Sequence, residues 1–314
     1  MIRYILARVI QAIPVLLIAS VAVFFVLRLV PGDPASALAG ENASQERVDE
    51  IRKDLGLEGP VAVQYVHWLR QVATGDLGTS VLNGLAVRRL IGLAARPTIE
   101  LALVAYPLAL AIGIPLGAAA GARPRSRWDL AATAYTTLAI GVPGFLTAIV
   151  MLWVFAIELD WLPASGYVSL LDDPVQAALH LAMPAATLAV GLSAVLARYT
   201  RTAVSQALTQ DYIRTARAKG LPERAVVMRH ALRVALVPVV TVAALQVGQL
   251  LSGAVVVEQV FTRPGMGRLM VGAITGRDYP VVQGGLLVLV ATFVLVNLAA
   301  DILAGIADPR AVQR

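Results

Sequence analysis

Residues 211–233, DYIRTARAKGLPERAVVMRHALR, form the most charged run between the long apolar segments of the chain. Arg217 and Lys219 lie in the last turn of a first predicted helix, where cations interact favourably with the helix dipole. Gly220 can adopt the left-handed conformation that ends a helix, and Pro222 fits the first turn of a following helix. The stretch therefore predicts a helix–glycine–helix unit that is exposed to water and suited to docking a partner.

The composition of the chain places this unit in a membrane protein. Of its 314 residues, 58% are hydrophobic and 15% are charged, whereas a soluble protein carries about 25% charged residues. The net charge of +6 falls on particular loops between apolar segments, which indicates a membrane topology signal and argues against nucleic-acid binding. Cysteine is absent, which excludes disulfides and thiolate sites, and the three histidines have no metal-ligand spacing.

Six apolar segments reach or approach the roughly 20 residues that a bilayer crossing needs. They lie at about residues 9–27, 98–121, 130–157, 181–197, 235–257 and 281–306. The third is interrupted by Gly141-Val142-Pro143-Gly144, and such breaks fit either helices around a pathway or ordinary kinks. We expect the first segment to be an uncleaved span, because its apolar run is too long for a signal peptide, although Ala35, Ala37 and Ala39 resemble a cleavage site.

The polar stretch after the first span predicts a small helical subdomain. Ser44 can cap a helix whose apolar face carries Val48 and Ile51, and Pro60 can open a second helix with an apolar stripe. Residues 75–80, GDLGTS, predict a turn and loop. We therefore divide the chain into a first span (1–30), a subdomain (31–97), a five-helix core (98–306) that includes the loop 198–233, and a tail (307–314).

The distribution of charge among the loops sets the expected orientation. Loop 122–129 carries three arginines and loop 198–233 carries eight basic residues, whereas loop 158–180 carries four acids and neither Lys nor Arg. Basic loops stay in the cytoplasm. Both termini and the unit at 211–233 are therefore expected in the cytoplasm, with the subdomain outside.

The spans carry few groups that could drive transport by themselves. Ionisable residues are nearly absent from mid-span positions, which argues against an ion-driven carrier. No nucleotide-binding glycine loop or hydrolase motif occurs in the sequence. Four of the uncharged polar residues in spans five and six are singled out as joining helices or lining a pathway: Gln246, Gln249, Ser252 and Asn297. A partner docked at residues 211–233 would then supply the energy. A self-contained channel or carrier, or a membrane enzyme, is the less favoured alternative.

Several motifs along the chain are similar to those of one family. The string DYIRTARAKGLP and the RHALR that follows resemble the permease subunits of binding-protein-dependent ABC importers, in the dipeptide, oligopeptide and nickel branch. The same holds for RLVPGDP (28–34), GDLGTS (75–80), EQVF (258–261), PGMGRL (264–269) and RDYP (277–280). The sequence departs from the general loop pattern of the superfamily at Arg214, Thr215, His230 and Arg233. The large outer loop resembles that of the first of the two paired permeases.

This resemblance implies an all-α membrane protein with the type I ABC importer permease fold and six transmembrane helices. It implies a non-enzymatic subunit in the cytoplasmic (inner) membrane of a bacterium or archaeon, with no cofactor or metal of its own, since ATP and Mg²⁺ belong to partner subunits. The implied partners are a second homologous permease, two ATPase subunits, an external substrate-binding protein and the lipid bilayer. The implied cargo is peptides, with nickel complexes, glutathione or haem as alternatives.

The resemblance also assigns roles within residues 211–233. Residues 211–219 are expected to form the coupling helix that docks an ATPase, with the chain turning at Gly220. The expected coupling residues are Asp211, Tyr212, Arg214, Thr215, Ala216, Arg217, Lys219, Gly220, Leu221 and Pro222. The subdomain is expected to contact the binding protein.

Overall fold

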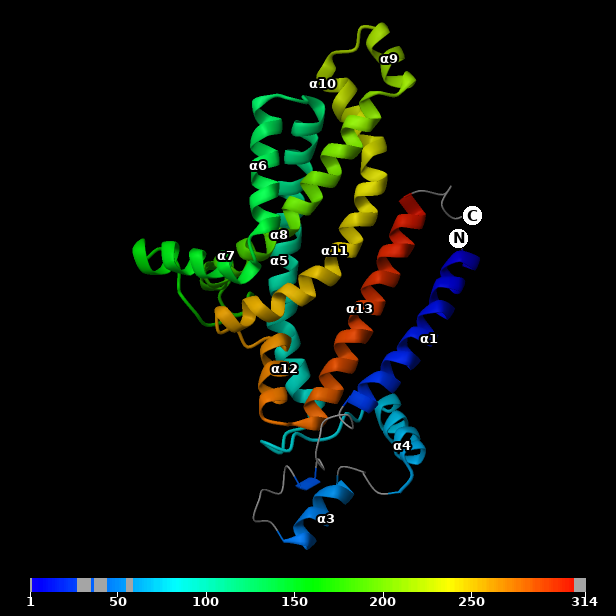
Figure 1. The fold of residues 1–314 in the computed structure, drawn as a ribbon, viewed down its shortest axis with the longest axis vertical. Coiled ribbons are helices and arrows are strands. Elements are labelled where there is room, and N and C mark those ends of the chain that lie inside the picture. The colour runs from blue at the N-terminus through cyan, green and yellow to red at the C-terminus, as the bar shows by residue number, and fades with distance from the viewer. Residues whose placement is uncertain (1, 27–34, 37–43, 55–58, 308–314) are drawn as a thin grey trace. The chain divides into compact units, whose positions relative to one another are not determined.

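The computed structural model describes residues 2–26, 35–36, 44–54 and 59–307, and this described part is helical (Figure 1). Within it, extended pairing is limited to one isolated bridge between Thr79 and Ala86. The chain divides into two compact units. Unit 1 comprises residues 1–5, 97–264 and 296–314, and unit 2 comprises residues 6–96 and 265–295. The division by spans and loops that we expect from the sequence stays a prediction.

Figure 1 shows the helices in chain order. Those in the first half of the chain are α1 (Ile2–Val26), α3 (Gln45–Asp54), α4 (Val61–Ala73), α5 (Val87–Ala122), α6 (Arg127–Gly141), α7 (Gly144–Met151) and the π-helix η1 (Leu152–Glu158). The remainder are α8 (Pro174–Leu208), α9 (Asp211–Ala218), α10 (Glu223–Ala225), the π-helix η2 (Val226–Ala231), α11 (Leu232–Val260), α12 (Met266–Thr275) and α13 (Tyr279–Ala307).

The predicted spans are confirmed at five helices, which are long and apolar enough to cross a membrane within α1, α5, α8, α10–α11 and α13. The third predicted span differs from the expectation of one helix over residues 130–157. The helix pair there is bent by 103°, and α7 leaves the line of α6 steeply (Figure 1). Val142 adopts an extended conformation at the bend because the following Pro143 disfavours the helical region for it. The structure thus has six spans only if this bent pair counts as one.

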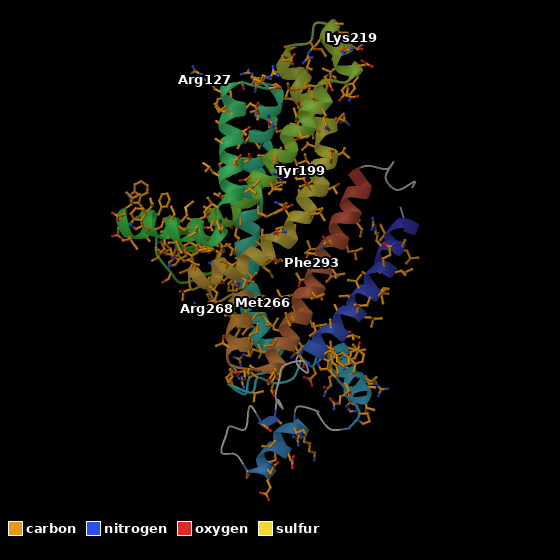
Figure 2. The ribbon with its side chains drawn as sticks, viewed as in Figure 1. Arg127, Tyr199, Lys219, Met266, Arg268 and Phe293 are labelled. Carbon is orange, nitrogen blue, oxygen red and sulfur yellow. The ribbon has the colours of Figure 1, made fainter. Side chains whose placement is uncertain are left out.

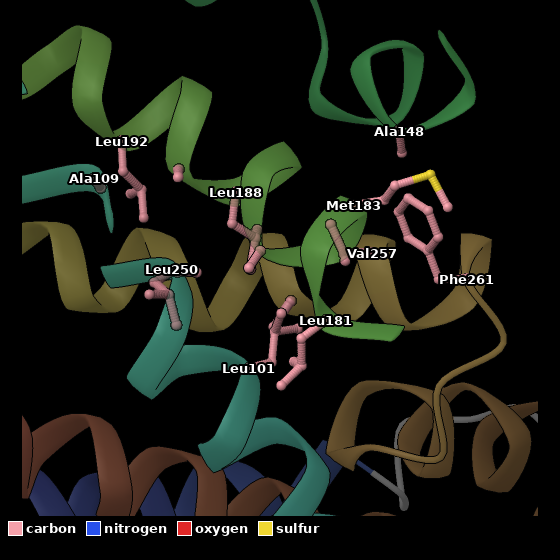
Figure 3. Close-up of a cluster of buried hydrophobic side chains, with 14 of the residues drawn as sticks. Leu101, Ala109, Ala148, Leu181, Met183, Leu188, Leu192, Leu250, Val257 and Phe261 are labelled. Carbon is pink, nitrogen blue, oxygen red and sulfur yellow. The ribbon is translucent and has the colours of Figure 1, made fainter. Parts of the chain in front are cut away.

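The core of unit 1 lies where α5, α8 and α11 meet. Leu101 of α5, Leu181 and Leu188 of α8, and Leu250 and Val257 of α11 are buried in one apolar cluster (Figure 3). Such a continuous cluster fixes the three long helices to one another. Loops at their ends are therefore held on a rigid support.

Close contact between α5 and α8 depends on three glycines spaced four residues apart. A Cβ atom at Gly113, Gly117 or Gly121 would come within 2.4–2.7 Å of a carbonyl oxygen of Ser193, Ala197 or Arg201, respectively. Distances below 3.0 Å are not found for real Cβ atoms, so any side chain would force the helices apart. Stripes of small residues at this spacing allow membrane helices to approach closely.

Unit 2 holds most of α1 together with α3 and α4. Tyr65 and Trp68 of α4 place their rings against Phe24 of α1, and the Tyr65 hydroxyl lies 2.8 Å from that of Ser20. The second helix predicted for the subdomain is thereby confirmed, with Pro60 at its N-cap, and its expected location outside the membrane stays a prediction. The first predicted external helix corresponds to α3, which ends at Asp54. The RLVPGDP motif (28–34) lies outside the described residues.

Candidate functional site

The predicted helix–glycine–helix unit is present at residues 211–225. α9 ends at Ala218, and Gly220 adopts a φ of +77°, in the left-handed region. The Gly220 amide donates to the Arg217 carbonyl at 2.9 Å and the Leu221 amide to the Ala216 carbonyl at 3.4 Å, which closes the helix end. Pro222 then serves as the N-cap residue of α10.

An ion pair spans the turn between the two helices. Arg217 donates from Nε to Glu223 Oε2 at 3.1 Å and from Nη2 to Glu223 Oε1 at 2.6 Å. The hydrogen bonds to this carboxylate raise the pKa of the Arg217 guanidinium above its ordinary value. Because both side chains are about half exposed, the pair adds little stability and chiefly fixes the direction of α10 relative to α9.

One face of α9 is seated on unit 1 and the other is exposed. Ile213 and Ala216 are buried in a cluster with Val204, Val226 and Ala231, at the ends of the long helices. Figure 2 places Lys219 and Arg127, from two basic loops, at the same end of this unit. The exposed residues of the expected coupling set are Asp211, Tyr212, Arg214, Thr215, Arg217, Lys219, Gly220, Leu221 and Pro222.

The structure therefore separates Ala216 from the other expected coupling residues, because its side chain faces inward. Ile213, which is fully buried, was not among those residues although it anchors the helix. The signal for it was available, since an apolar pair at positions i and i+3 on a polar helix indicates an inward face.

The four polar residues that we singled out in spans five and six lie in different surroundings. Gln246 is buried, and its Nε2 donates to the Leu192 carbonyl at 3.4 Å, so it joins α11 to α8. Gln249 and Ser252 are exposed on another face of α11. Asn297 is half-buried on α13. Of these residues, Gln249 and Ser252 therefore remain the candidates that could face a pathway.

A buried ionic cluster joins segments of unit 1 that are distant in sequence. Arg263 is fully buried after the end of α11, and its Nη2 lies 3.4 Å from Glu100 Oε2 of α5. Its Nε donates to the Pro97 carbonyl at 3.2 Å, and its guanidinium lies 4.8 Å from the centre of the Tyr167 ring. Burial lowers the pKa of Arg263 from its ordinary value, and the nearby carboxylates and Tyr167 oppose that change.

Further hydrogen bonds complete this cluster. Glu100 Oε1 accepts from the Tyr167 hydroxyl and the Ser169 hydroxyl, each at 3.3 Å. The fully buried Glu258 accepts from the Thr98 hydroxyl at 2.5 Å. The cluster therefore ties the loop before α8 to the neighbouring ends of α5 and α11. Sequence reasoning did not pair the two glutamates with Arg263.

In unit 2, a buried carboxylate connects two of the sequence motifs. Asp278 of the RDYP motif is 2% exposed and accepts hydrogen bonds from the Ser80 hydroxyl and, at 3.2 Å, from the Val81 amide. Ser80 ends the GDLGTS motif, in which Gly78 takes a φ of +81°. The two motifs, nearly 200 residues apart, thus form one structural corner at the start of α13.

Comparisons with known proteins give a consistent result. Residues 113–313 match the family model described as "binding-protein-dependent transport system inner membrane component", and residues 1–84 match a second model for the N-terminal part of such membrane components. A putative peptide transport system permease protein of Brucella suis biovar 1 is 44% identical over 306 residues, covering 98% of each chain. A glutathione transport system permease protein of Salmonella typhimurium is 39% identical over 310 residues, also covering 98% of each chain.

Two solved structures show the same fold. One is the MetNI methionine ABC transporter in an inward-facing conformation, with a TM-score of 0.56, 20% identity, and coverage of 70% of this chain and 96% of that chain. The other is an amino acid ABC transporter with histidines, with a TM-score of 0.53, 15% identity, and coverage of 77% and 98%, respectively. At such identities the similarity extends to the fold alone, which is that of type I ABC importer permeases.

Proposed function

Because the chain belongs to the family of binding-protein-dependent transport system inner membrane components, we propose that it forms half of the membrane pathway of an ATP-driven peptide importer. The observation that carries this proposal is the α9–Gly220–α10 unit, which is seated on the core of unit 1 and presents its other face to solvent. A permease without a nucleotide-binding motif of its own needs such a surface to receive the energy of ATP hydrolysis.

The exposed face of α9 docks one ATPase subunit. Tyr212 and Leu221 are 40% and 38% exposed although both are largely apolar. Tyrosine is enriched among the residues that dominate the energy of protein interfaces, and an aliphatic side chain such as that of Leu221 can fill an apolar pocket of the partner. Movement of the ATPase reaches the spans through Ile213 and Ala216, whose cluster includes residues of α8 and of η2. A second permease, a second ATPase subunit and an external binding protein complete the importer, and ATP and Mg²⁺ bind to the ATPase subunits.

Within the pathway, Gln249 and Ser252 face the cargo. Both are uncharged, and both offer hydrogen bonds that the amide groups of a peptide backbone can accept or donate. Peptides are the proposed cargo because relatives covering the full chain are named as peptide permeases. Glutathione, which is itself a tripeptide, is the second candidate because a relative of similar identity is named for it.

Docking is tested by copurification of the chain with the ATPase subunits. Tyr212→Ala and Leu221→Ala should each weaken the association by roughly tenfold or more, as expected for interface anchors. Both variants should keep the thermal stability of the wild-type chain because the two side chains are exposed. The control is Ile213→Ala, which should lower the stability by about 2–5 kcal/mol because it empties a buried site. Unchanged ATPase association in both surface variants would refute the docking role.

Import is tested in proteoliposomes that contain this chain, the second permease and the ATPase subunits. Uptake of a labelled dipeptide or oligopeptide should require both ATP and the binding protein. Transport by the purified chain alone would show a self-contained carrier and would reject the proposal. ATP-dependent uptake of glutathione without uptake of other peptides would assign the cargo to the second candidate.

A further inference from the structure

A cavity of about 240 Å³ lies at the end of unit 1 that carries the connection between α5 and α6. α5 contributes Ala120 and Gly121 to its wall, and the connection contributes Pro124. Two successive turns of α8 contribute the polar residues Arg201, Thr202, Ser205 and Gln206. The lining thus includes one guanidinium, two hydroxyls and one amide from a single stretch of helix, and the Thr202 hydroxyl donates to the Arg198 carbonyl at 3.1 Å. Its volume is below the range of pockets for drug-sized ligands and suits a small polar group.

The guanidinium of Arg201 is held in a fixed position. Its Nε donates to Asp129 Oδ1 at 2.5 Å and its Nη2 to Asp129 Oδ2 at 3.1 Å. Asp129 also accepts from the Arg125 amide at 2.8 Å. Arginine has five N–H donors, and the part of the chain that the structure describes provides no partner for the others of Arg201. The side chain therefore keeps donors for a ligand while its geometry is set in advance.

The surroundings of the cavity are strongly basic. Residues 120–129 and 198–206 together carry five arginines and one acid. The four arginines besides Arg201 are all exposed: Arg123, Arg125, Arg127 and Arg198. A ligand of this cavity is therefore expected to be an anion.

The neighbouring apolar side chains place the cavity at a membrane surface. Trp128 and Leu130, at the start of α6, are 60% and 73% exposed. Tryptophan is enriched at the level of lipid headgroups, and arginine-rich loops gather on the cytoplasmic side. The cavity therefore opens among the headgroups of the cytoplasmic leaflet.

We propose that this cavity binds the phosphate headgroup of an anionic phospholipid from the cytoplasmic leaflet. Basic pockets between membrane helices on this side are suited to such headgroups. The phosphate oxygens accept hydrogen bonds from Arg201 and Ser205, while the acyl chains lie along the apolar surface of the spans. A bound lipid would stabilise the corner of α5, α6 and α8. This inference depends on the orientation of the chain and not on the proposed cargo.

The full-length chain in detergent micelles provides the test. Binding of a fluorescent short-chain phosphatidylglycerol is compared with that of the matching phosphatidylcholine, and phosphatidylglycerol should bind about tenfold more tightly. Thr202→Leu fills the cavity without changing its charge, and Ser205→Ala removes one hydroxyl. Thr202→Leu should weaken phosphatidylglycerol binding by about tenfold because the larger side chain occupies the cavity. Ser205→Ala should weaken it by about threefold because a hydrogen bond to the phosphate is lost. The matched control is Thr137→Leu, which alters an exposed threonine of α6 outside the cavity and should leave the affinity unchanged.

Three results would overturn the proposal. The first is equal affinity for the two lipids, or unchanged phosphatidylglycerol binding in variants whose thermal unfolding shows that they are folded. The second is displacement of the lipid by inorganic phosphate or glycerol phosphate at equal concentration, which would identify a soluble phosphate ester as the ligand. The third is loss of binding once the ATPase subunits are added, which would assign the cavity to their interface. Persistence of binding in the assembled complex supports the proposal.

Discussion

The turn between α9 and α10 depends on the backbone conformation of one residue, Gly220. Its φ is +77°, and among the described residues no heavy atom lies within 4 Å of the position that a Cβ would occupy. The constraint is therefore conformational rather than steric. A non-glycine residue in this region costs roughly 1–2 kcal/mol, and a β-branched residue is a genuine outlier there.

We predict that Gly220→Val leaves the chain inserted but uncouples ATP hydrolysis from import, because a shifted turn redirects the ATPase contact. Gly220→Asn should retain most activity, since asparagine tolerates the left-handed conformation better than valine. The measurement is the ratio of peptide transported to ATP hydrolysed in proteoliposomes. An unchanged ratio in Gly220→Val would exclude a coupling role for the turn.

Arg263 is the residue on which the buried ionic cluster depends. Replacing it with methionine removes the cation and leaves Glu100 and Glu258 buried without it. We expect Arg263→Met to destabilise the chain by about 3–5 kcal/mol, since a buried charge that loses its partner is costly. Thermal unfolding in detergent measures the loss. In the double variant Arg263→Met/Glu100→Gln, part of the stability should return, and strict additivity of the two single effects would contradict the pairing.

These two residues show what a sequence reveals at this scale. The signals for Gly220 are local, because a helix end, a glycine and a proline follow one another within a few residues. Arg263 and Glu100 are separated by 163 positions, and periodicity along the chain carries no information on such a pair. The same holds for Ser80 and Asp278, although each belongs to a motif that was recognised separately.

Among the helices, the contact between α5 and α8 is the most sensitive to side-chain size. A Cβ at Gly117 would lie 2.4 Å from the Ala197 carbonyl oxygen. We predict that Gly117→Ala destabilises the chain by about 1–3 kcal/mol, as overpacking does. The matched control is Gly92→Ala in the same helix, where no described heavy atom lies within 4 Å and where alanine should be neutral or slightly stabilising. Equal unfolding temperatures for the two variants would refute this close approach.

The third predicted span shows the limit of hydropathy at the scale of elements. Residues 130–157 are apolar enough to be read as one helix, yet Val142 and Pro143 separate α6 from α7 at a bend of 103°. The break at residues 141–144 could be predicted from the sequence. The angle between α6 and α7 could not, because the packing of α7 against α8 and α11 determines that angle. The glycine stripe of α5 was equally visible, with a period of four, and was not used.

For the whole molecule, composition and loop charge predict the class and topology. A chain with 58% hydrophobic residues must bury its surface in lipid, and this gave the helical membrane fold that the structure and its relatives share. The charges of the loops then predict the orientation of the chain in the membrane. The role that we propose for each site depends on this orientation. If residues 211–233 faced outward, α9 could not dock an ATPase and the Arg201 cavity could not meet the cytoplasmic leaflet.

Because the sequence contains no cysteine, this orientation can be tested with single introduced cysteines, and no native cysteine has to be removed first. Lys219→Cys places a thiol on the exposed end of α9, and Leu171→Cys places one on an 83% exposed residue of the acidic loop before α8. We predict that a membrane-impermeant maleimide labels Leu171→Cys in intact spheroplasts, whereas it labels Lys219→Cys only after the membrane is opened. The wild-type chain should remain unlabelled in both conditions. The reverse pattern would place the α9–Gly220–α10 unit outside the cell, and both the coupling role and the lipid site would then have to be abandoned.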